Sequence, residues 1–129
     1  MKSPIEVVEE WIQHFNHADL NALTELYDEN AINHQVVMQP LIGISAIREM
    51  FEIEFSRAKM VCIKEAIYPS GDWAILEWRD PNGLRGCGFF KIQNEKIVFQ
   101  RGYFDQLTFF RKQGLEIPSD YLNQGNSTQ

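Results

Sequence analysis

Two aspartates follow aromatic runs and could transfer protons. Asp105 comes directly after Tyr103 and Phe104, and Asp80 follows Trp78 after one residue. Burying a carboxylate among aromatic side chains is costly and raises its pKa, which makes it a general acid or base near neutral pH. We therefore predict Asp105 as the main proton-transfer group. At the rim of a sheet the same residue would only end a strand, and for Asp80 a role confined to its turn is the favoured interpretation.

Alternation along the predicted strands indicates a pocket around these carboxylates. Side chains two residues apart in a strand point to the same face. Large aromatic groups mixed with a few charged ones are typical of a ligand site. The predicted shared face comprises Trp78, Asp80, Cys87, Phe89, Arg101, Tyr103 and Asp105. Phe99, Tyr103 and Trp78 would raise the pKa of Asp105, and Arg101 would oppose that effect. The alternative is an Arg101–Asp105 pair that reaches water.

Helices and then strands must position these residues. Ser3 to Glu6 forms a capping box with Pro4 at the first helical position, and apolar residues follow at helical spacing to Phe15. Asp19 can cap a second helix that runs to Tyr27. The pattern also predicts an extended piece at 31–37, a third helix at about 43–55, and strands at 60–68, 73–79, 84–92 and 96–107. This order is typical of the α+β class, with three helices packed on one face of a curved antiparallel sheet.

Length and charge limit the classes of function. The chain has 129 residues, a mass of 15.1 kDa and a net charge of -6, which predicts one domain over residues 1–122 and a polar tail at 123–129. An acidic chain without a basic stripe argues against a nucleic-acid partner. No apolar run approaches the ~18 residues of a membrane span. We expect a cytoplasmic protein with no membrane partner.

Cofactor and metal motifs are absent from the sequence. No Cys-x-x-Cys or His-x-x-x-His pair provides metal-ligand spacing, and no Gly-x-Gly-x-x-Gly or Walker-type loop provides a nucleotide site. We therefore expect no metal and no cofactor. Cys62 and Cys87 are expected to be two reduced thiols, although a disulfide between them stays an alternative.

Four segments resemble a known superfamily. They are Leu26-Tyr27-Asp28-Glu29-Asn30-Ala31, Pro40-Leu41-Ile42-Gly43, Gly88-Phe89-Phe90-Lys91-Ile92 and Arg101-Gly102-Tyr103-Phe104-Asp105. Over about residues 4–115 the chain resembles the nuclear transport factor 2-like superfamily, and its SnoaL-like (polyketide cyclase-like) branch matches best. The resemblance implies a cone-shaped α+β barrel with an apolar internal pocket, often assembled as a homodimer.

The resemblance also implies roles for individual residues. In SnoaL-like cyclases the Asp after Tyr-Phe is an acid/base, which is Asp105 here. The general-base position of ketosteroid isomerases holds His34, which could move protons near neutral pH. The oxyanion-hole positions of those isomerases hold Trp11 and Cys87, which are poor donors to an enolate.

Limonene epoxide hydrolase, another member of this superfamily, implies a second set of positions. Its two catalytic Asp match Asp80 and Asp105, and its Arg falls on Trp78. Its water-holding Tyr and Asn fall on Asn33 and Gln35.

The leading hypothesis is a cofactor-independent acid/base enzyme that isomerises, dehydrates, cyclises or hydrolyses a small apolar, oxygenated molecule. Asp105, His34 and Asp80 would be catalytic. Substrate would bind to Trp11, Phe15, Trp78, Cys87, Phe89, Arg101 and Tyr103. The alternative is a non-catalytic ligand-binding or dimerisation module of the same fold. A cavity where His34, Asp80 and Asp105 converge would favour the enzyme, and a cone filled by side chains would favour the module.

Overall fold

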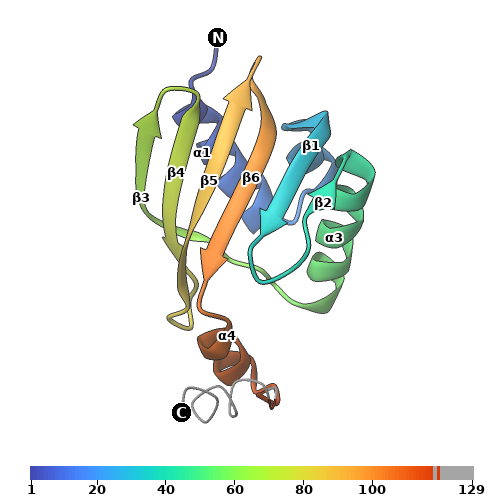
Figure 1. Ribbon diagram of the computed structural model, residues 1–129, viewed down its shortest axis with the longest axis vertical. Coiled ribbons are helices and arrows are strands. Elements are labelled where there is room, and N and C mark those ends of the chain that lie inside the picture. Colours follow the sequence, from blue (N-terminus) through green and yellow to red (C-terminus); the bar gives the residue numbers. More distant parts are fainter. Residues whose placement is uncertain (118, 120–129) are drawn as a thin grey trace, which may run out of the picture.

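The computed structural model describes residues 1–117 and residue 119. A curved six-stranded sheet carries α1, α2 and α3 on one side, and α4 follows the last strand beyond the end of the sheet (Figure 1). The helices are α1 (Pro4–Asn16), α2 (Leu20–Glu25), α3 (Ile44–Arg57) and α4 (Gln106–Gln113). The strands are β1 (Tyr27–Gln35), β2 (Leu41–Ile42), β3 (Ile63–Ser70), β4 (Trp73–Arg79), β5 (Arg85–Gln93) and β6 (Lys96–Phe104). The predicted α+β class is confirmed.

The sheet has the strand order β2-β1-β6-β5-β4-β3 and is not closed into a barrel. The strands β3 to β6 form the predicted antiparallel meander. β1 lies parallel to β6, with Asn33 opposite Gln100 and His34 opposite Arg101. This arrangement leaves an inner face that meets the helices and an outer face that does not.

The first helix forms where the sequence predicts it. The Ser3 hydroxyl accepts from the Glu6 backbone N–H at 3.2 Å, and the Glu6 carboxylate accepts from the Ser3 N–H at 3.0 Å. This capping box satisfies N–H groups that have no partner inside the helix. The buried face of α1 includes Trp11, whose ring stacks on Phe15 with 4.8 Å between centroids. Phe90 of the sheet meets the Trp11 ring edge-on at 5.3 Å.

Two local predictions were wrong, and one short strand was missed. Tyr27 begins β1 instead of ending α2. The Ile97 N–H of β6 donates to the Leu26 carbonyl, so the pairing of β1 with β6 already begins at this point. The last strand ends at Phe104 instead of residue 107, because Asp105 caps α4, which the sequence pattern did not predict. The short strand β2 was also missed.

The predicted tail at 123–129 lies outside the described residues. None of the helices in the described part of the chain is long and apolar enough to cross a membrane.

Candidate functional site

The predicted pocket face is divided between the two sides of the sheet. Residues directly opposite each other on neighbouring strands share a face. Trp78 lies opposite Gly86, whereas Cys87 lies opposite Glu77 on one side and Tyr103 on the other. The Trp78 ring covers Gly86 on the inner face, where an added Cβ would come within 2.5 Å of it. The prediction that Trp78 shares a face with Cys87 and Tyr103 was wrong, because strand alternation alone does not relate one strand to the next.

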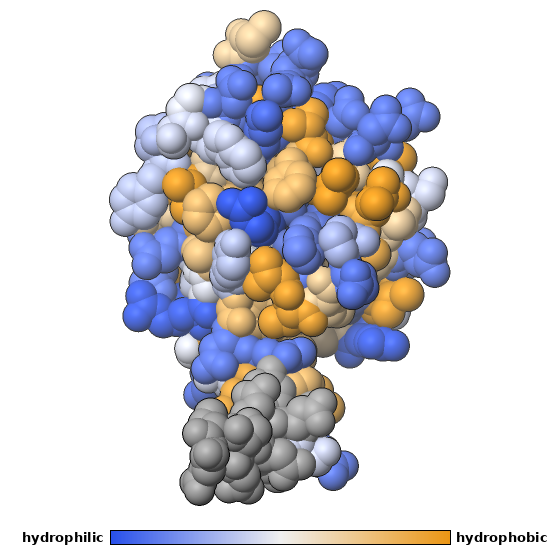
Figure 2. All heavy atoms as spheres, viewed as in Figure 1, coloured by the Kyte–Doolittle hydropathy of each residue, from blue (hydrophilic) through white to orange (hydrophobic). Residues whose placement is uncertain are grey.

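The outer face carries an aromatic cluster around Arg101. The Arg101 guanidinium carbon lies 5.0 Å from the ring centre of Phe89 and 5.8, 5.8 and 5.9 Å from those of Trp73, Phe99 and Tyr103. Its Nε is buried and has no hydrogen-bond partner among the described residues. Figure 2 views this face and shows hydrophobic and strongly hydrophilic residues mixed across it. Arg101, Phe89, Tyr103 and Cys87 therefore lie away from the helices, not inside the cone.

The two predicted catalytic aspartates hold local structure. The Asp80 carboxylate accepts from the backbone N–H groups of Asn82 at 2.9 Å and Leu84 at 2.8 Å, which closes its turn. The Asp105 carboxylate caps α4. It accepts hydrogen bonds from the Leu107 backbone N–H at 3.0 Å and from the Thr108 hydroxyl at 2.5 Å.

The predicted rise in the pKa of Asp105 was wrong. The side chain is exposed, and the Thr108 hydroxyl lowers the pKa of this carboxyl below its ordinary value. Hydrogen bonds to a carboxylate stabilise its charged form. The alternative Arg101–Asp105 ion pair is not formed either.

His34 lies on the outer face of β1. It is the register partner of Arg101, whereas its neighbour Asn33 is the partner of Gln100 and is 1% exposed on the inner face. The expectation that His34 faces Asp105 from the helical layer was therefore wrong. The structure places His34 on one face of the sheet, Asp80 in a turn and Asp105 at a helix start.

A chain of hydrogen bonds between buried polar groups lies inside the cone. The Trp11 Nε1–H donates to the Tyr27 hydroxyl at 2.9 Å, and the Tyr27 hydroxyl donates to the Gln100 Oε1. All three side chains are buried. Burial raises the pKa of Tyr27, so its hydroxyl stays protonated. We call Trp11, Tyr27 and Gln100 the interior polar chain.

Two further amides lie beside this chain on the inner face. The Gln35 Nε2 donates to the Asn33 Oδ1 at 2.9 Å. The Asn33 Nδ2 is buried and has no partner among the described residues. Buried donors are nearly always paired in folded proteins. Gly102 leaves room for this pair, because a Cβ there would lie 2.1 Å from the Gln35 Oε1.

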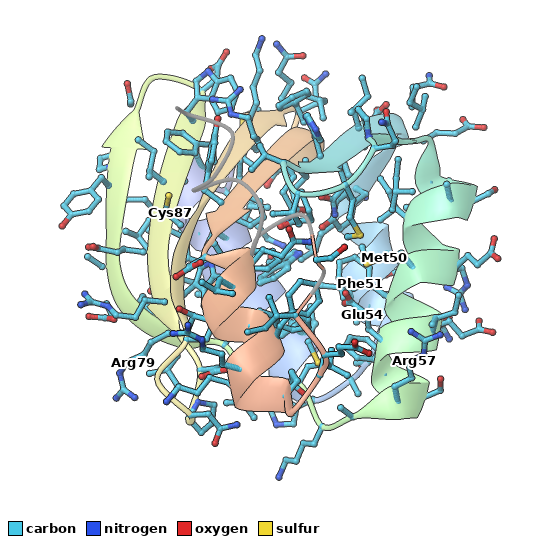
Figure 3. The ribbon with its side chains drawn as sticks, turned by 60° about the horizontal axis from the view of Figure 1, so that its bottom comes forward. Met50, Phe51, Glu54, Arg57, Arg79 and Cys87 are labelled. Carbon is cyan, nitrogen blue, oxygen red and sulfur yellow. The ribbon has the colours of Figure 1, made fainter. Side chains whose placement is uncertain are left out.

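Glu54 contributes a carboxyl group from the helical layer. It follows the buried Phe51 by one turn of α3, and the ring of Phe51 lies 6.1 Å from that of Tyr27. In Figure 3 the side chains of Met50, Phe51 and Glu54 lie between α3 and the middle of the molecule, whereas Arg79 points away from it. Burial raises the pKa of Glu54 to about 7, and its charge interacts with Tyr27.

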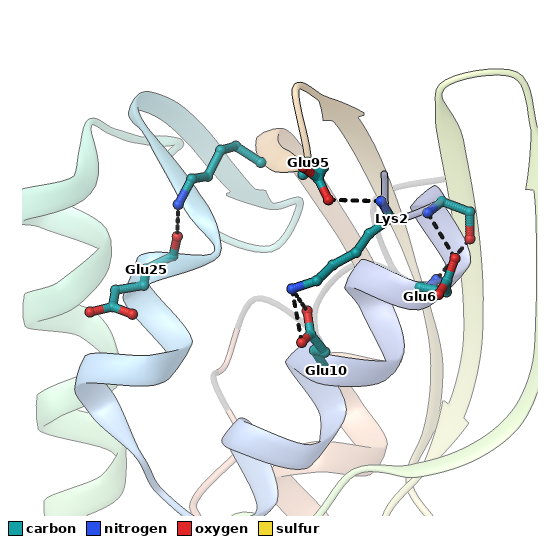
Figure 4. A network of polar contacts seen from close by, with 7 residues as sticks. Lys2, Glu6, Glu10, Glu25 and Glu95 are labelled. Carbon is teal, nitrogen blue, oxygen red and sulfur yellow. Dashed lines mark hydrogen bonds and ion pairs between the residues drawn. The ribbon is translucent and has the colours of Figure 1, made fainter.

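Aromatic side chains fill much of the interior. The rings of Trp11, Phe15, Phe51 and Phe90 contact one another there, so Trp11 and Phe15 lie where the prediction placed them, on the inner side. Two open hollows lined by described residues lie elsewhere, around Lys2 and Glu95. Polar contacts line this edge, including Lys2 with Glu10 at 2.8 Å (Figure 4). These hollows are polar and exposed and do not connect the predicted catalytic residues.

The described residues include no metal-ligand cluster, and their two cysteines are free thiols. Among the described residues no group of three or more His, Cys, Asp or Glu side chains is arranged to hold a metal ion. Cys62 and Cys87 are not bonded to each other. Burial raises the pKa of Cys62 to about 12 and also raises the pKa of Cys87, which leaves both thiols protonated at neutral pH.

Sequence reasoning missed Tyr27, Gln100 and Glu54. Gln100 is buried on the inner face, where it lies opposite Phe90. Glu54 could have been found, because it lies three residues after Phe51 and seven after Ile47, both on the apolar face of the third predicted helix. The limonene epoxide hydrolase resemblance did point to Asn33 and Gln35, which lie side by side.

Solved structures with the same fold include several proteins of low sequence identity. A candidate polyketide cyclase from Pseudomonas putida is 18% identical, with a TM-score of 0.79 over 87% of this chain and 98% of that one. An M. tuberculosis LEH-like epoxide hydrolase is 17% identical, with a TM-score of 0.76 over 84% and 87%. A protein with a ketosteroid isomerase-like fold from Catenulispora acidiphila is 16% identical, with a TM-score of 0.76 over 92% and 98%. At these identities the comparisons establish the fold alone.

No curated protein matches the sequence. The model of the SnoaL-like domain family matches residues 8–100, which is most of the chain. Its solved structural neighbours include an NTF2-like protein from Cytophaga hutchinsonii with a TM-score of 0.73, 17% identical over 85% of this chain and 96% of that one. The chain therefore belongs to the SnoaL-like domain family and has the nuclear transport factor 2-like fold.

Proposed function

We propose that this protein binds a small, apolar, oxygenated molecule between the sheet and the helices and acts on it by acid/base chemistry without a cofactor. The observation that carries this proposal is the interior polar chain together with the unpaired Asn33 amide beside it. Trp11, Tyr27 and Gln100 hydrogen-bond one another, whereas the buried Asn33 Nδ2 has no partner among the described residues, and such an unpaired donor is costly. These polar groups lie between the sheet and the helices, and their presence there is explained if they bind an oxygen atom of a ligand.

The surroundings of the chain define the ligand. Aromatic rings favour a flat or cyclic apolar body, and the unused Asn33 Nδ2 donor favours a neutral acceptor oxygen. Phe51 borders the interior polar chain, since its ring lies 6.1 Å from that of Tyr27, and small shifts of Phe51 and of its α3 neighbour Met50 would admit such a molecule. The reaction classes in the names of the structural neighbours, epoxide hydrolysis and polyketide cyclisation, are compatible with an oxygenated apolar substrate.

Ligand binding tests the proposal directly. Side-chain amide signals of Asn33 and Gln100 would be followed by NMR while a panel of apolar ketones, phenols and epoxides is added. We expect at least one compound to shift both signals in a saturable manner. The Gln100→Glu variant keeps the size of the side chain and should weaken that binding. Shifts restricted to the outer face, or none at all across the panel, would contradict an interior site.

The catalytic roles of Asp105, His34 and Asp80 stay predictions. If Asp105 transfers a proton, it does so from the start of α4 at the end of the sheet. Replacing Asp105 with Asn in an enzyme with an identified substrate tests this role. Unchanged turnover would exclude it.

A second candidate is assembly of a homodimer through the outer face of the sheet. It is favoured by the aromatic rings that fill much of the interior, which is the arrangement expected of a module, and by the aromatic cluster around Arg101 on the outer face. Tyr103 in this cluster is 41% exposed, and Tyr68 of β3 is 53% exposed. Clustered aromatic and Arg residues are typical of interface centres. Light scattering after size-exclusion chromatography should give a dimer mass for the wild type and a monomer mass for Phe89→Glu. Ile53→Glu, on the exposed side of α3, serves as the matched control and should stay dimeric. A monomeric wild type would exclude this assembly.

A further inference from the structure

The carboxyl group of Glu54 has no structural task in the fold. It accepts no hydrogen bond and forms no ion pair among the described residues, unlike Asp80 and Asp105, which hold a turn and a helix start. Yet it lies on the same side of α3 as the buried Ile47 and Phe51, and the Phe51 ring is 6.1 Å from that of Tyr27 in the interior polar chain (Figure 3). A half-buried carboxyl group without a partner costs stability, and such groups are concentrated at functional sites.

We propose that Glu54 is the proton-transfer residue of the interior site and that the Asn33 amide holds the oxygen of its substrate, a small neutral apolar ketone. The inference rests on the proposed function, since it requires an oxygenated ligand between the sheet and α3. It assigns the chemistry to the helical layer, whereas the sequence pattern assigned it to the ends of the strands.

Two independent features of the interior support this pairing. Asn33 is 1% exposed and its Nδ2 donor has no partner among the described residues, so an acceptor oxygen is the group that the site lacks. Tyr27 connects the two layers, because its hydroxyl donates to Gln100 of the sheet while its ring lies 6.1 Å from Phe51 of α3. Because α3 packs on β1 and Asn33 faces inward from β1, a ketone with its oxygen at Asn33 would extend its carbon skeleton toward α3, which carries Glu54.

Glu54 forms no ion pair with the charged groups on the elements around it. The elements packed against α3 are α1, α2, β1 and β2. Of the titratable groups on them, Tyr27 interacts with Glu54. The groups that form no ion pair with it are Glu6, Glu9, Glu10 and His14 on α1, Glu25 on α2, Asp28, Glu29 and His34 on β1, and Arg48, Glu49, Glu52 and Arg57 on α3 itself. Burial is the cause that raises the pKa of Glu54 to about 7. The carboxyl group can therefore both accept and return a proton near neutral pH.

The proposed step is a proton transfer at the carbon next to the carbonyl. The Glu54 carboxylate removes that proton, the C–H bond breaks, and an O–H bond forms on the carboxyl group. The electron pair forms a carbon–carbon double bond while the carbonyl pair moves onto oxygen, where the Asn33 N–H stabilises the charge. Return of a proton from Glu54 to carbon completes the cycle, and no oxidant or reductant is needed.

Hydrogen–deuterium exchange of 1-indanone tests the step. The folded protein is mixed with 1-indanone in deuterated buffer, and loss of the proton signal next to the carbonyl is followed by NMR. We expect the wild type to accelerate exchange over buffer, with a rate that rises with pH to a plateau and a midpoint near pH 7. Glu54→Gln should lower the protein-dependent rate about 100-fold, within the range for a positioned base. Glu52→Gln, on the exposed side of α3, is the matched control and should keep the wild-type rate.

Binding of 1-indanone, read from the Asn33 amide signals, separates the two proposals. Bound ketone with equal exchange rates in the wild type and Glu54→Gln would overturn the role of Glu54 and leave the interior site standing. If neither binding nor exchange occurs, the proposed function fails together with the role of Glu54. A wild-type rate without the midpoint near pH 7 would also overturn the assignment to Glu54.

Discussion

Replacing Glu54 with Gln should change how the stability of the protein depends on pH. The folded state holds the Glu54 proton up to a pKa of about 7, whereas the ordinary value is 4.5. As pH rises from 4.5 to 7, the unfolded chain ionises first, so the wild type loses stability over this window. The variant has no carboxyl group at this position and escapes that loss.

The size of the effect follows from the two pKa values. The difference between about 7 and 4.5 corresponds to roughly 3 kcal/mol, at ~1.4 kcal/mol for each pH unit. Because Glu54 is only half-buried, solvent screening reduces this to about 1–2 kcal/mol. Glu54→Gln should therefore unfold with a free energy close to that of the wild type at pH 4.5, and higher by this amount at pH 8.

Urea unfolding at a series of pH values measures this difference. Glu52→Gln removes the same charge from the exposed side of α3 and corrects for the change in net charge. An equal free-energy difference between Glu54→Gln and the wild type at pH 4.5 and pH 8 would refute the reasoning, because it would mean that folding does not alter the ionisation of Glu54.

Three other substitutions test the packing. Gly86→Ala should lower the free energy of unfolding by about 1–3 kcal/mol in urea titrations, since its Cβ would lie 2.5 Å from the Trp78 ring and 2.6 Å from a backbone oxygen of β6; a neutral effect would show that this part of β5 can shift. Tyr27→Phe should lower the free energy of unfolding by about 1–3 kcal/mol, because it leaves the Gln100 Oε1 and the Trp11 N–H without their partner. A smaller loss would mean that these two groups pair with each other or with water. Asp105→Ala should speed backbone hydrogen exchange in α4 without changing exchange in the central strands, because the Asp105 cap holds a helix that has no buried residue; uniform protection of α4 in both proteins would contradict the capping role.

The sequence by itself determined the first and third helices and the antiparallel strands β3 to β6, but not β2 or α4. The capping box at Ser3, the helical spacing through Phe15 and the period of two after residue 60 are local patterns, and each produced the expected element. Local signals also identified the turn at Asp80. These features depend on backbone hydrogen bonds and side chains within a few residues, so the sequence carries them directly.

Only the tertiary structure decided which residues meet. Alternation along β6 correctly grouped Arg101 with Tyr103 and separated both from Gln100. The register between strands and the burial of Gln100 show that the group containing Gln100 faces the helices. Asp105 remained in water because β6 ends there and a helix begins, and solvent with the Thr108 hydroxyl stabilises its charge. Glu54 acquired its raised pKa because α3 packs its carboxyl group toward Tyr27, which is 27 residues earlier in the chain. Desolvation depends on atoms brought together by the whole fold, and no local pattern contains that information.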